Sequence, residues 1–258
     1  MNAAALLFAT WSIVAVDPKT REVGAAAASC IYSDTLSIDQ IAELVPGTGG
    51  VVAQALANLE AADAIADAIA RGESPAAALS AATAPGADER LGLDLSRLRQ
   101  YGAVTFDAGP VSFTGTWNGD WAGARAGSSV SVQGNILRGP EVVEGALAAF
   151  EKEAPACLAE RLLSALEAGA RAGGDRRCVA ELGALTAFLA VAQPSDPRGE
   201  PSLRLLRTRP DEPPSGPWDE LRRRFRPEPG TLEQSPVSLL RRAFDEERAA
   251  GRAPKSCR

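Results

Sequence analysis

Histidine is absent from this sequence of 258 residues. Imidazole is the side chain whose unperturbed pKa lies closest to physiological pH, so its absence excludes a Ser-His-Asp triad, a Cys-His pair and a histidine-ligated metal site. The sequence also has no run of about 18 consecutive apolar residues, and we therefore expect no membrane span. If the protein is a hydrolase, its general base is something other than histidine.

Positive charge is scarce as well. Lysine and arginine number 27 against 33 acidic residues, which gives a net charge of −6, and the basic residues form no dense stripe. We therefore expect no nucleic-acid partner. The hydrophobic content of 45% suits one medium-sized domain with a sizeable core and an appendage.

The four cysteines are not arranged as a metal site. Cys30, Cys157, Cys178 and Cys257 lack the paired CxxC spacing of a zinc centre, and we expect neither a metal nor a cofactor. Disulfides between them become plausible only if the chain leaves the cytoplasm for an oxidising compartment.

The first regular structure is a predicted hairpin close to the beginning of the chain. Residues 10–16 are small, β-branched or aromatic, the turn signal Asp17-Pro18-Lys19-Thr20 follows, and residues 22–28 return as a second strand. The returning strand is almost entirely alanine and glycine. Such a composition indicates a strand confined between two layers, where larger side chains would not fit.

The remaining pattern alternates between hairpins and pairs of helices, which favours antiparallel sheets covered by helices, an α+β domain, over a βαβ arrangement. The predicted strands are 49–55, 99–106, 111–115, 128–133, 183–193 and 202–207, and the predicted helices are 59–71, 75–82, 140–153 and 156–170.

We divide the chain into a leader (1–9), a domain (10–207) and an appendage rich in proline and arginine (208–258). The appendage has two helical patches, around 218–225 and 236–249, whose apolar residues could pack onto the domain or contact a partner. A partly ordered appendage with solvated charges is favoured over a dedicated binding module.

Thr10 occupies a position with chemical meaning. A threonine hydroxyl is a weak nucleophile unless a base removes its proton, and one recurrent solution makes the threonine residue one, so that its own α-amine is the base. An α-amine titrates at about 7.7–8.0, and this mechanism requires no histidine. Its condition is that residues 1–9 are removed.

Five segments then carry a resemblance to a known family. They are 10–15 (TWSIVA), 53–55 (AQA) with Asn58, 133–142 (QGNILRGPEV), 158–163 (LAERLL) and 173–177 (GGDRR). In this order they resemble the domain-of-unknown-function family numbered 1028 (DUF1028), within the N-terminal-nucleophile (Ntn) hydrolase superfamily, from Thr10 to about residue 206. The resemblance implies a four-layer αββα sandwich of antiparallel sheets, whose leading threonine attacks an amide or similar acyl bond.

The resemblance makes Thr10 the candidate nucleophile. Ser12 shares its strand face and could hydrogen-bond the amine, or it is an ordinary strand residue. Gln133 and Asn135 bracket a glycine and suit amide donors to an oxyanion, or they satisfy loop backbone. Asp175 could orient the amine, although a turn aspartate after two glycines is the simpler interpretation.

Further residues follow from the same resemblance. Gln54 and Asn58 are candidate substrate-binding residues, and Trp121 either walls a pocket or lies at the surface. A disulfide between Cys30 and Cys178 is a hypothesis that belongs to one of three full pairings of the four cysteines.

The leader is apolar and ends in alanine, but it lacks a basic n-region and is shorter than a usual signal peptide. We interpret it as a truncated signal peptide, which predicts a periplasmic or extracellular protein, or a cytoplasmic one if Met1 is the true start.

The expected function is that of an Ntn amidohydrolase acting through an acyl-enzyme on Thr10. Its substrate would be a small-molecule or peptide-like acyl compound, and a homo-oligomer is compatible with it. The alternative is a non-catalytic binding or structural protein, in one version associated with the cell envelope, that retains the fold.

Overall fold

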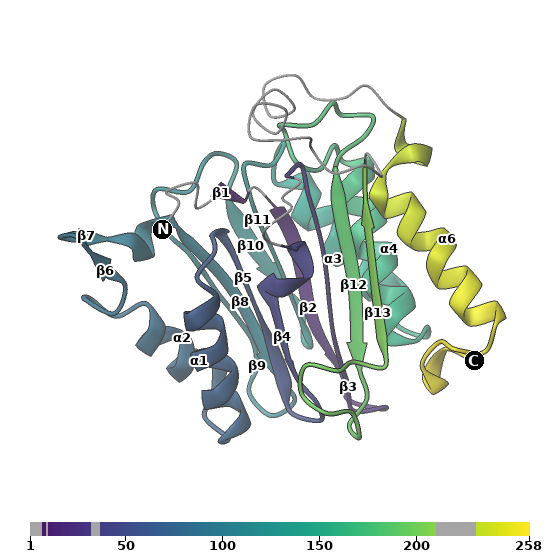
Figure 1. Cartoon of the computed structure of the whole chain (residues 1–258), viewed down its shortest axis with the longest axis horizontal. Coiled ribbons are helices and arrows are strands. Elements are labelled where there is room, and N and C mark those ends of the chain that lie inside the picture. Colours follow the sequence, from purple (N-terminus) through teal and green to yellow (C-terminus); the bar gives the residue numbers. More distant parts are fainter. Residues whose placement is uncertain (1–6, 9, 32–36, 210–230) are drawn as a thin grey trace.

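The structure is a computed structural model that describes residues 7–8, 10–31, 37–209 and 231–258. It has two large antiparallel sheets, a small projecting hairpin and helices that pack on the sheets (Figure 1). The predicted α+β class with antiparallel sheets is confirmed at this level.

The first sheet has the predicted N-terminal hairpin at its centre. Its strand order is β10-β11-β2-β3-β12-β13. In the register of this sheet, Thr10 lies opposite Ser29 on one side and Asn135 on the other. The strands are β2 (Thr10–Asp17), β3 (Glu22–Ser29), β10 (Gly123–Ala126), β11 (Val130–Asn135), β12 (Thr186–Ala192) and β13 (Leu203–Thr208).

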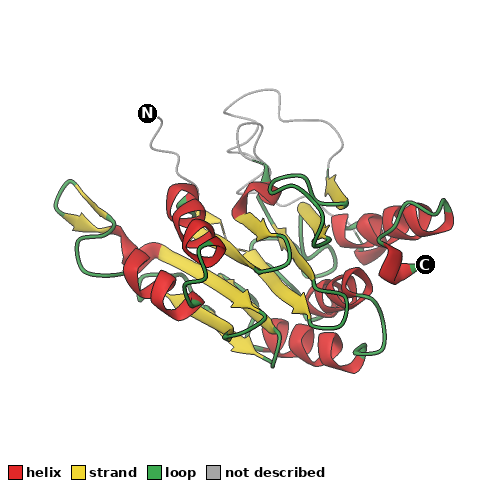
Figure 2. Ribbon diagram, turned by 90° about the horizontal axis from the view of Figure 1, so that it is seen from below, coloured by secondary structure: helices red, strands yellow, loops and turns green. Residues whose placement is uncertain are grey.

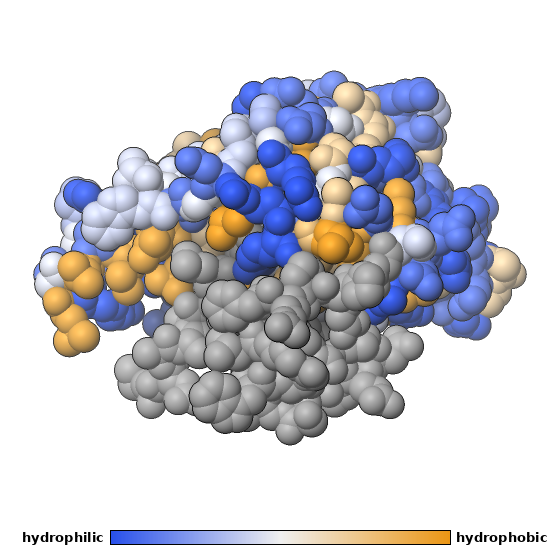
Figure 3. Space-filling view, turned by 90° about the horizontal axis from the view of Figure 1, so that it is seen from above, coloured by the Kyte–Doolittle hydropathy of each residue, from blue (hydrophilic) through white to orange (hydrophobic). Residues whose placement is uncertain are grey.

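The second sheet has the order β1-β5-β8-β9, and β4 also pairs with β5. Its strands are β1 (Leu7–Phe8), β4 (Ala42–Val45), β5 (Gly49–Leu56), β8 (Arg99–Thr105) and β9 (Gly109–Thr114). A separate hairpin, β6 (Glu89–Arg90) and β7 (Leu93–Asp94), projects at the left of Figure 1, on the side of the molecule that holds the second sheet. It exposes Leu91 and Leu93. Figure 3 shows hydrophobic side chains gathered at the same end of an otherwise largely hydrophilic face.

The helices pack on the faces of the sheets that point away from each other (Figure 2). One cluster joins α1 (Leu59–Ala70) and α2 (Pro75–Ala82) to β5 and β8, and another joins α3 (Glu141–Lys152) and α4 (Leu158–Arg171) to β2, β3, β11 and β12. A third cluster lies between the two sheets and includes Val14, Val16, Val52 and Val104. Among the described residues, no helix combines the length and apolarity needed to cross a membrane.

Strand β3 is buried on both faces, as its alanine-rich composition predicts. Ala26 and Ala28 belong to the cluster under the helices, whereas Ala25 and Ala27 belong to the cluster between the sheets. A Cβ at Gly24 would lie 2.6 Å from Leu162 Cδ1 of α4. Small side chains therefore allow the helix and the second sheet to approach this strand from opposite sides.

The segment 208–258 contains a helix, α6 (Pro236–Ala249), that belongs to the main core. Leu240 and Phe244 are completely buried in the cluster under α4, and a disulfide joins Cys157 to Cys257. The predicted helical patch at 236–249 is thus present and packs onto the domain, whereas the patch at 218–225 lies outside the described residues. Strands β4 and β10 were not predicted, because each is only four residues long and lacks a β-branched run.

Candidate active site

Thr10 begins β2 and directs its side chain into the layer between the two sheets. Alternation along the strand gives Thr10 the same face as Val14, which packs between the sheets, while Trp11 and Ile13 face the helices. The side chain of Thr10 is completely buried. Its hydroxyl oxygen has no hydrogen-bond partner among the described residues, which is unusual for a buried polar atom.

Two residues with amide side chains, Gln54 and Asn135, neighbour Thr10. Gln54, on β5, donates from Nε2 to the carbonyl oxygen of Thr10 at 3.1 Å. Asn135 is the direct cross-strand neighbour of Thr10 and donates from Nδ2 to Gln100 Oε1 at 3.2 Å. The other side-chain oxygens, Gln54 Oε1 and Asn135 Oδ1, are buried without a partner in the described part of the chain. The site therefore has acceptor positions ready for an incoming N–H group.

Gln100 of β8 connects the two amides, and sequence reasoning missed it. Its Oε1 accepts from Gln54 Nε2 at 2.7 Å as well as from Asn135, and its Nε2 donates to Thr114 Oγ1 at 2.9 Å and to Gly134 O at 2.8 Å. The available signal was a polar residue on the same alternating face as Val104 in a buried strand.

Gln133 and Ser12 pair with each other instead of pointing to Thr10. Gln133 Nε2 donates to Ser12 Oγ at 2.6 Å, and its Oε1 accepts from Ser131 Oγ at 2.7 Å. A Cβ at Gly102, on the facing strand β8, would lie 2.0 Å from Gln133 Oε1. Both polar ends of Gln133 are thus occupied, and Ser12 supports this buried amide.

The Asp175 carboxylate does not contact Thr10 but binds the backbone at the end of β3 and the side chain of Arg177. It accepts from the Cys30 N–H at 2.7 Å and forms a 2.6 Å ion pair with Arg177. The structure also joins Cys30 to Cys178 by a disulfide. Because Cys30 follows Ser29, the cross-strand neighbour of Thr10, these contacts position the end of β3.

Asn58 and Trp121 do not converge on Thr10. Asn58 is the N-cap of α1, where its Oδ1 accepts from the Ala61 N–H at 3.1 Å. Trp121 packs against the cluster under α3 and α4, with the Arg125 guanidinium 6.0 Å from its ring centroid. These two expected substrate-binding residues therefore have structural contacts elsewhere.

The residue after each of these two amides has a strained backbone. Ala55 and Ile136, which directly follow Gln54 and Asn135, have φ angles of 67° and 51°. Left-handed backbone is unfavourable for residues with a Cβ, most of all for a β-branched one, and costs about 1–2 kcal/mol per residue. Such outliers cluster at functional sites, where the surrounding structure holds them in place.

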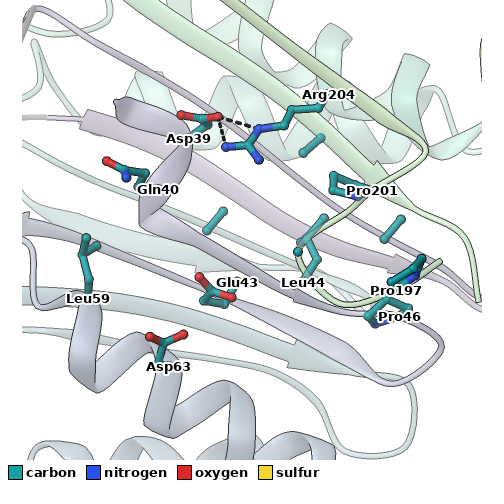
Figure 4. A pocket seen from close by; sticks show the side chains of 14 residues that line it. Asp39, Gln40, Glu43, Leu44, Pro46, Leu59, Asp63, Pro197, Pro201 and Arg204 are labelled. Atoms are coloured by element: carbon teal, nitrogen blue, oxygen red, sulfur yellow. Dashed lines mark hydrogen bonds and ion pairs between the residues drawn. The ribbon is translucent and has the colours of Figure 1, made fainter. Parts of the chain in front are cut away.

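A cavity of about 240 Å³ elsewhere on the molecule is unrelated to Thr10. It is lined by residues of β4, α1, β12, β13 and the loop that precedes β13, and Figure 4 shows Asp39 paired with Arg204 at its rim. Burial and the neighbouring Asp63 raise the pKa of the Glu43 carboxyl there. None of the lining residues belongs to the group around Thr10.

The comparisons with known proteins begin at the same residue as the site. A family model described as a family of unknown function, DUF1028, matches residues 10–221, so the matched region starts at Thr10. The chain belongs to DUF1028. This confirms the family resemblance of the sequence motifs.

A solved structure supports the fold of this DUF1028 protein. The crystal structure of protein SPO2555 from Silicibacter pomeroyi, described with the same family, is similar with a TM-score of 0.68 and 22% identity. The match covers 93% of this chain and 89% of that one. The comparison with curated proteins gave no match.

Proposed function

We propose that this protein is an Ntn amidohydrolase in which Thr10, once the residues before it are removed, attacks an amide or similar acyl bond. In this proposal the two sheets with helices on their outer faces are the αββα sandwich of that superfamily. The observation that carries the proposal is the buried, unpartnered hydroxyl of Thr10, together with the unpartnered side-chain oxygens of its cross-strand neighbour Asn135 and its hydrogen-bond partner Gln54. No histidine is needed, because the α-amine of residue 10 supplies the base.

The chemistry of the cluster fits a free amine at residue 10. A newly exposed amine or ammonium brings two or three N–H donors, and the cluster holds unpartnered acceptors at Gln54 Oε1 and Asn135 Oδ1. These contacts would satisfy both oxygens and orient the amine toward its own hydroxyl.

The proposed reaction has two steps. Thr10 Oγ bonds to the carbonyl carbon while its proton moves to the α-amine, and the C–N bond then breaks as that proton passes to the leaving nitrogen. Water next hydrolyses the ester, which releases the acid and restores the hydroxyl. The side-chain N–H of Asn135 that does not bond to Gln100 is the donor we assign to the developing oxyanion, because both N–H groups of Gln54 already donate to Thr10 O and Gln100 Oε1.

We further propose that the protein is exported. The Cys30–Cys178 and Cys157–Cys257 disulfides support an oxidising compartment, since cytosolic thiols are kept reduced.

The test labels the protein with a β-lactone, which opens on an activated hydroxyl and leaves an ester. Intact mass of protein purified without reductant first establishes whether the mature chain begins at Thr10 and lacks free thiols. We expect one adduct, on the N-terminal peptide, retained in Thr10→Ser and in the hairpin-turn control Thr20→Ala and lost in Thr10→Ala. Labelling that persists in Thr10→Ala, or a mature chain with another N-terminus, refutes the mechanism and leaves the non-catalytic binding protein.

A further inference from the structure

The residues just before Thr10 lie on the edge of the second sheet. Strand β1 pairs antiparallel with the end of β5, with Leu7 opposite Leu56 and Phe8 opposite Ala55. Strand β8 covers one edge of β5 from Gly49 to Ala55, so β1 and β4 share the other edge. Strand β4 pairs only as far as Val52, and β1 occupies the edge beyond it.

The chain leaves this edge directly at the candidate site. Phe8 pairs within the second sheet and Thr10 within the first, so the chain passes from one sheet to the other between them. Gln54, next to Ala55, donates to the carbonyl oxygen of Thr10. The segment just before Thr10, strand β1, is therefore paired with β5 next to the candidate site.

We infer that the β5 edge at Ala55–Leu56 is a peptide-binding edge, and that the substrate class is an acyl donor with an extended main chain. This inference rests on the proposed function of Thr10. Removal of the leader frees the main-chain groups of the edge that pair with β1, and these form a template for an added strand, while the Leu56 carbonyl also accepts from the Arg99 guanidinium. The leader shows the direction of that strand, with the acyl carbonyl at the end nearest Thr10.

The inference restricts the substrate in a specific way. Main-chain pairing supplies affinity for at least two residues on the acyl side of the scissile bond, whereas side chains at those positions add selectivity. An acyl donor without such an extended backbone would make no main-chain hydrogen bonds to the β5 edge. A peptide or a peptide-like amide is thus favoured over a compact acyl group.

The probe is the synthetic peptide Leu-Leu-Phe-Ala with a free carboxylate, which corresponds to the acyl product of cleavage before Thr10. It is titrated by calorimetry into a chain that begins at Thr10 and into the full chain. The shorter chain retains every residue of the buried clusters that the structure describes. We expect binding to the shorter chain and none to the full chain, where the leader occupies the edge.

Two N-methylated peptides are the matched controls, one at each position equivalent to Leu7 and Phe8. In an antiparallel pair, adjacent residues alternate between hydrogen-bonded and non-hydrogen-bonded pairs. One methylated peptide should therefore bind at least about fivefold more weakly and the other should be unaffected. Equal effects at both positions, or no binding of the parent peptide to the shorter chain, overturn the inference.

A second measurement uses the full chain. Leu7→Pro or Phe8→Pro, whichever removes the paired N–H, should speed amide hydrogen exchange at the end of β5, and the other should not. Unchanged exchange in both variants also overturns the inference. Peptide binding without β-lactone labelling would support the peptide-binding edge and refute catalysis by Thr10. Labelling without peptide binding would support catalysis by Thr10 and refute the peptide-binding edge.

Discussion

The two ends of the layer between the sheets are built on the same strands from opposite kinds of side chain. Strand β2 places Thr10 and Ser12 at one end and Val14 and Val16 at the other, and β5 and β8 change in the same way from glutamine to valine. We call these the polar end and the apolar end. Both are buried, so solvent exposure does not explain the difference.

The polar end lowers the stability of the fold. Its unpartnered oxygens on Thr10, Gln54 and Asn135 each carry a desolvation penalty of about 1–3 kcal/mol, whereas the valines of the apolar end gain free energy from burial. Residues that break local rules without stabilising the fold are expected at functional sites. The comparison therefore favours function as the reason for the polar end and packing as the reason for the apolar end.

The largest expected effect is at the apolar end. Leu44→Ala removes most of a buried side chain from the cluster between the sheets, at the β4 residue paired with Gly50, which in turn lies opposite Val104. It should lower the free energy of unfolding by about 2–5 kcal/mol, measured from the denaturant midpoint. The matched change at the polar end, Asn135→Ala, removes one 3.2 Å hydrogen bond and an unpartnered oxygen, so it should cost no more than about 1.5 kcal/mol. Equal losses would remove the distinction between the ends.

An intermediate effect is expected where the two sheets approach at the polar end. Gly102→Ala places a Cβ 2.0 Å from Gln133 Oε1 and should destabilise the protein by about 1–3 kcal/mol. Gly145→Ala in α3 is the control, since its nearest atom would be 4.0 Å away, and it should stabilise the helix by about 0.5–1 kcal/mol. Thermal and denaturant unfolding measure both. A neutral Gly102→Ala would mean that Gln133 is free to move.

The smallest effect is expected when the side-chain types of Thr10 and Val14, which share one face of β2, are exchanged. Thr10→Val removes an unpartnered buried hydroxyl and should raise the free energy of unfolding by about 1 kcal/mol while it abolishes β-lactone labelling. The reciprocal Val14→Thr introduces such a hydroxyl at the apolar end and should cost about 1–3 kcal/mol. If Thr10→Val destabilises the protein instead, its hydroxyl has a structural partner and the argument from its isolation fails.

Much of the architecture could be predicted because it depends on local pattern. Strands β2, β3, β5 and β8 are long and buried, and the hairpin strands among them are joined by clear turn signals. Helices α1 through α4 have clear apolar spacing or caps, so these elements could be predicted from composition, spacing and turn chemistry. Four-residue strands such as β4 and β10 have too few residues for a pattern. Their pairing depends on neighbours that are distant in the chain.

The site divides in the same way. The candidate role of Thr10 and the absence of histidine could be predicted from the sequence, and Gln54 and Asn135 were both among the candidate residues. The separate roles of Gln54, Asn135 and Gln133 could not, because a hydrogen-bond partner is chosen by the packing of two sheets. Gln100 was missed for that reason, and the structure shows that Asn58, an expected substrate-binding residue, caps a helix.

The sequence by itself determined the family, the α+β class, the leading threonine and the exclusion of imidazole chemistry, because these depend on residue identity and short-range spacing. Only the tertiary structure decided which polar side chains are left without partners and where the segment before Thr10 lies. Those outcomes depend on contacts between strands that are tens of residues apart, and the free energy of each contact exists only once both sheets are formed.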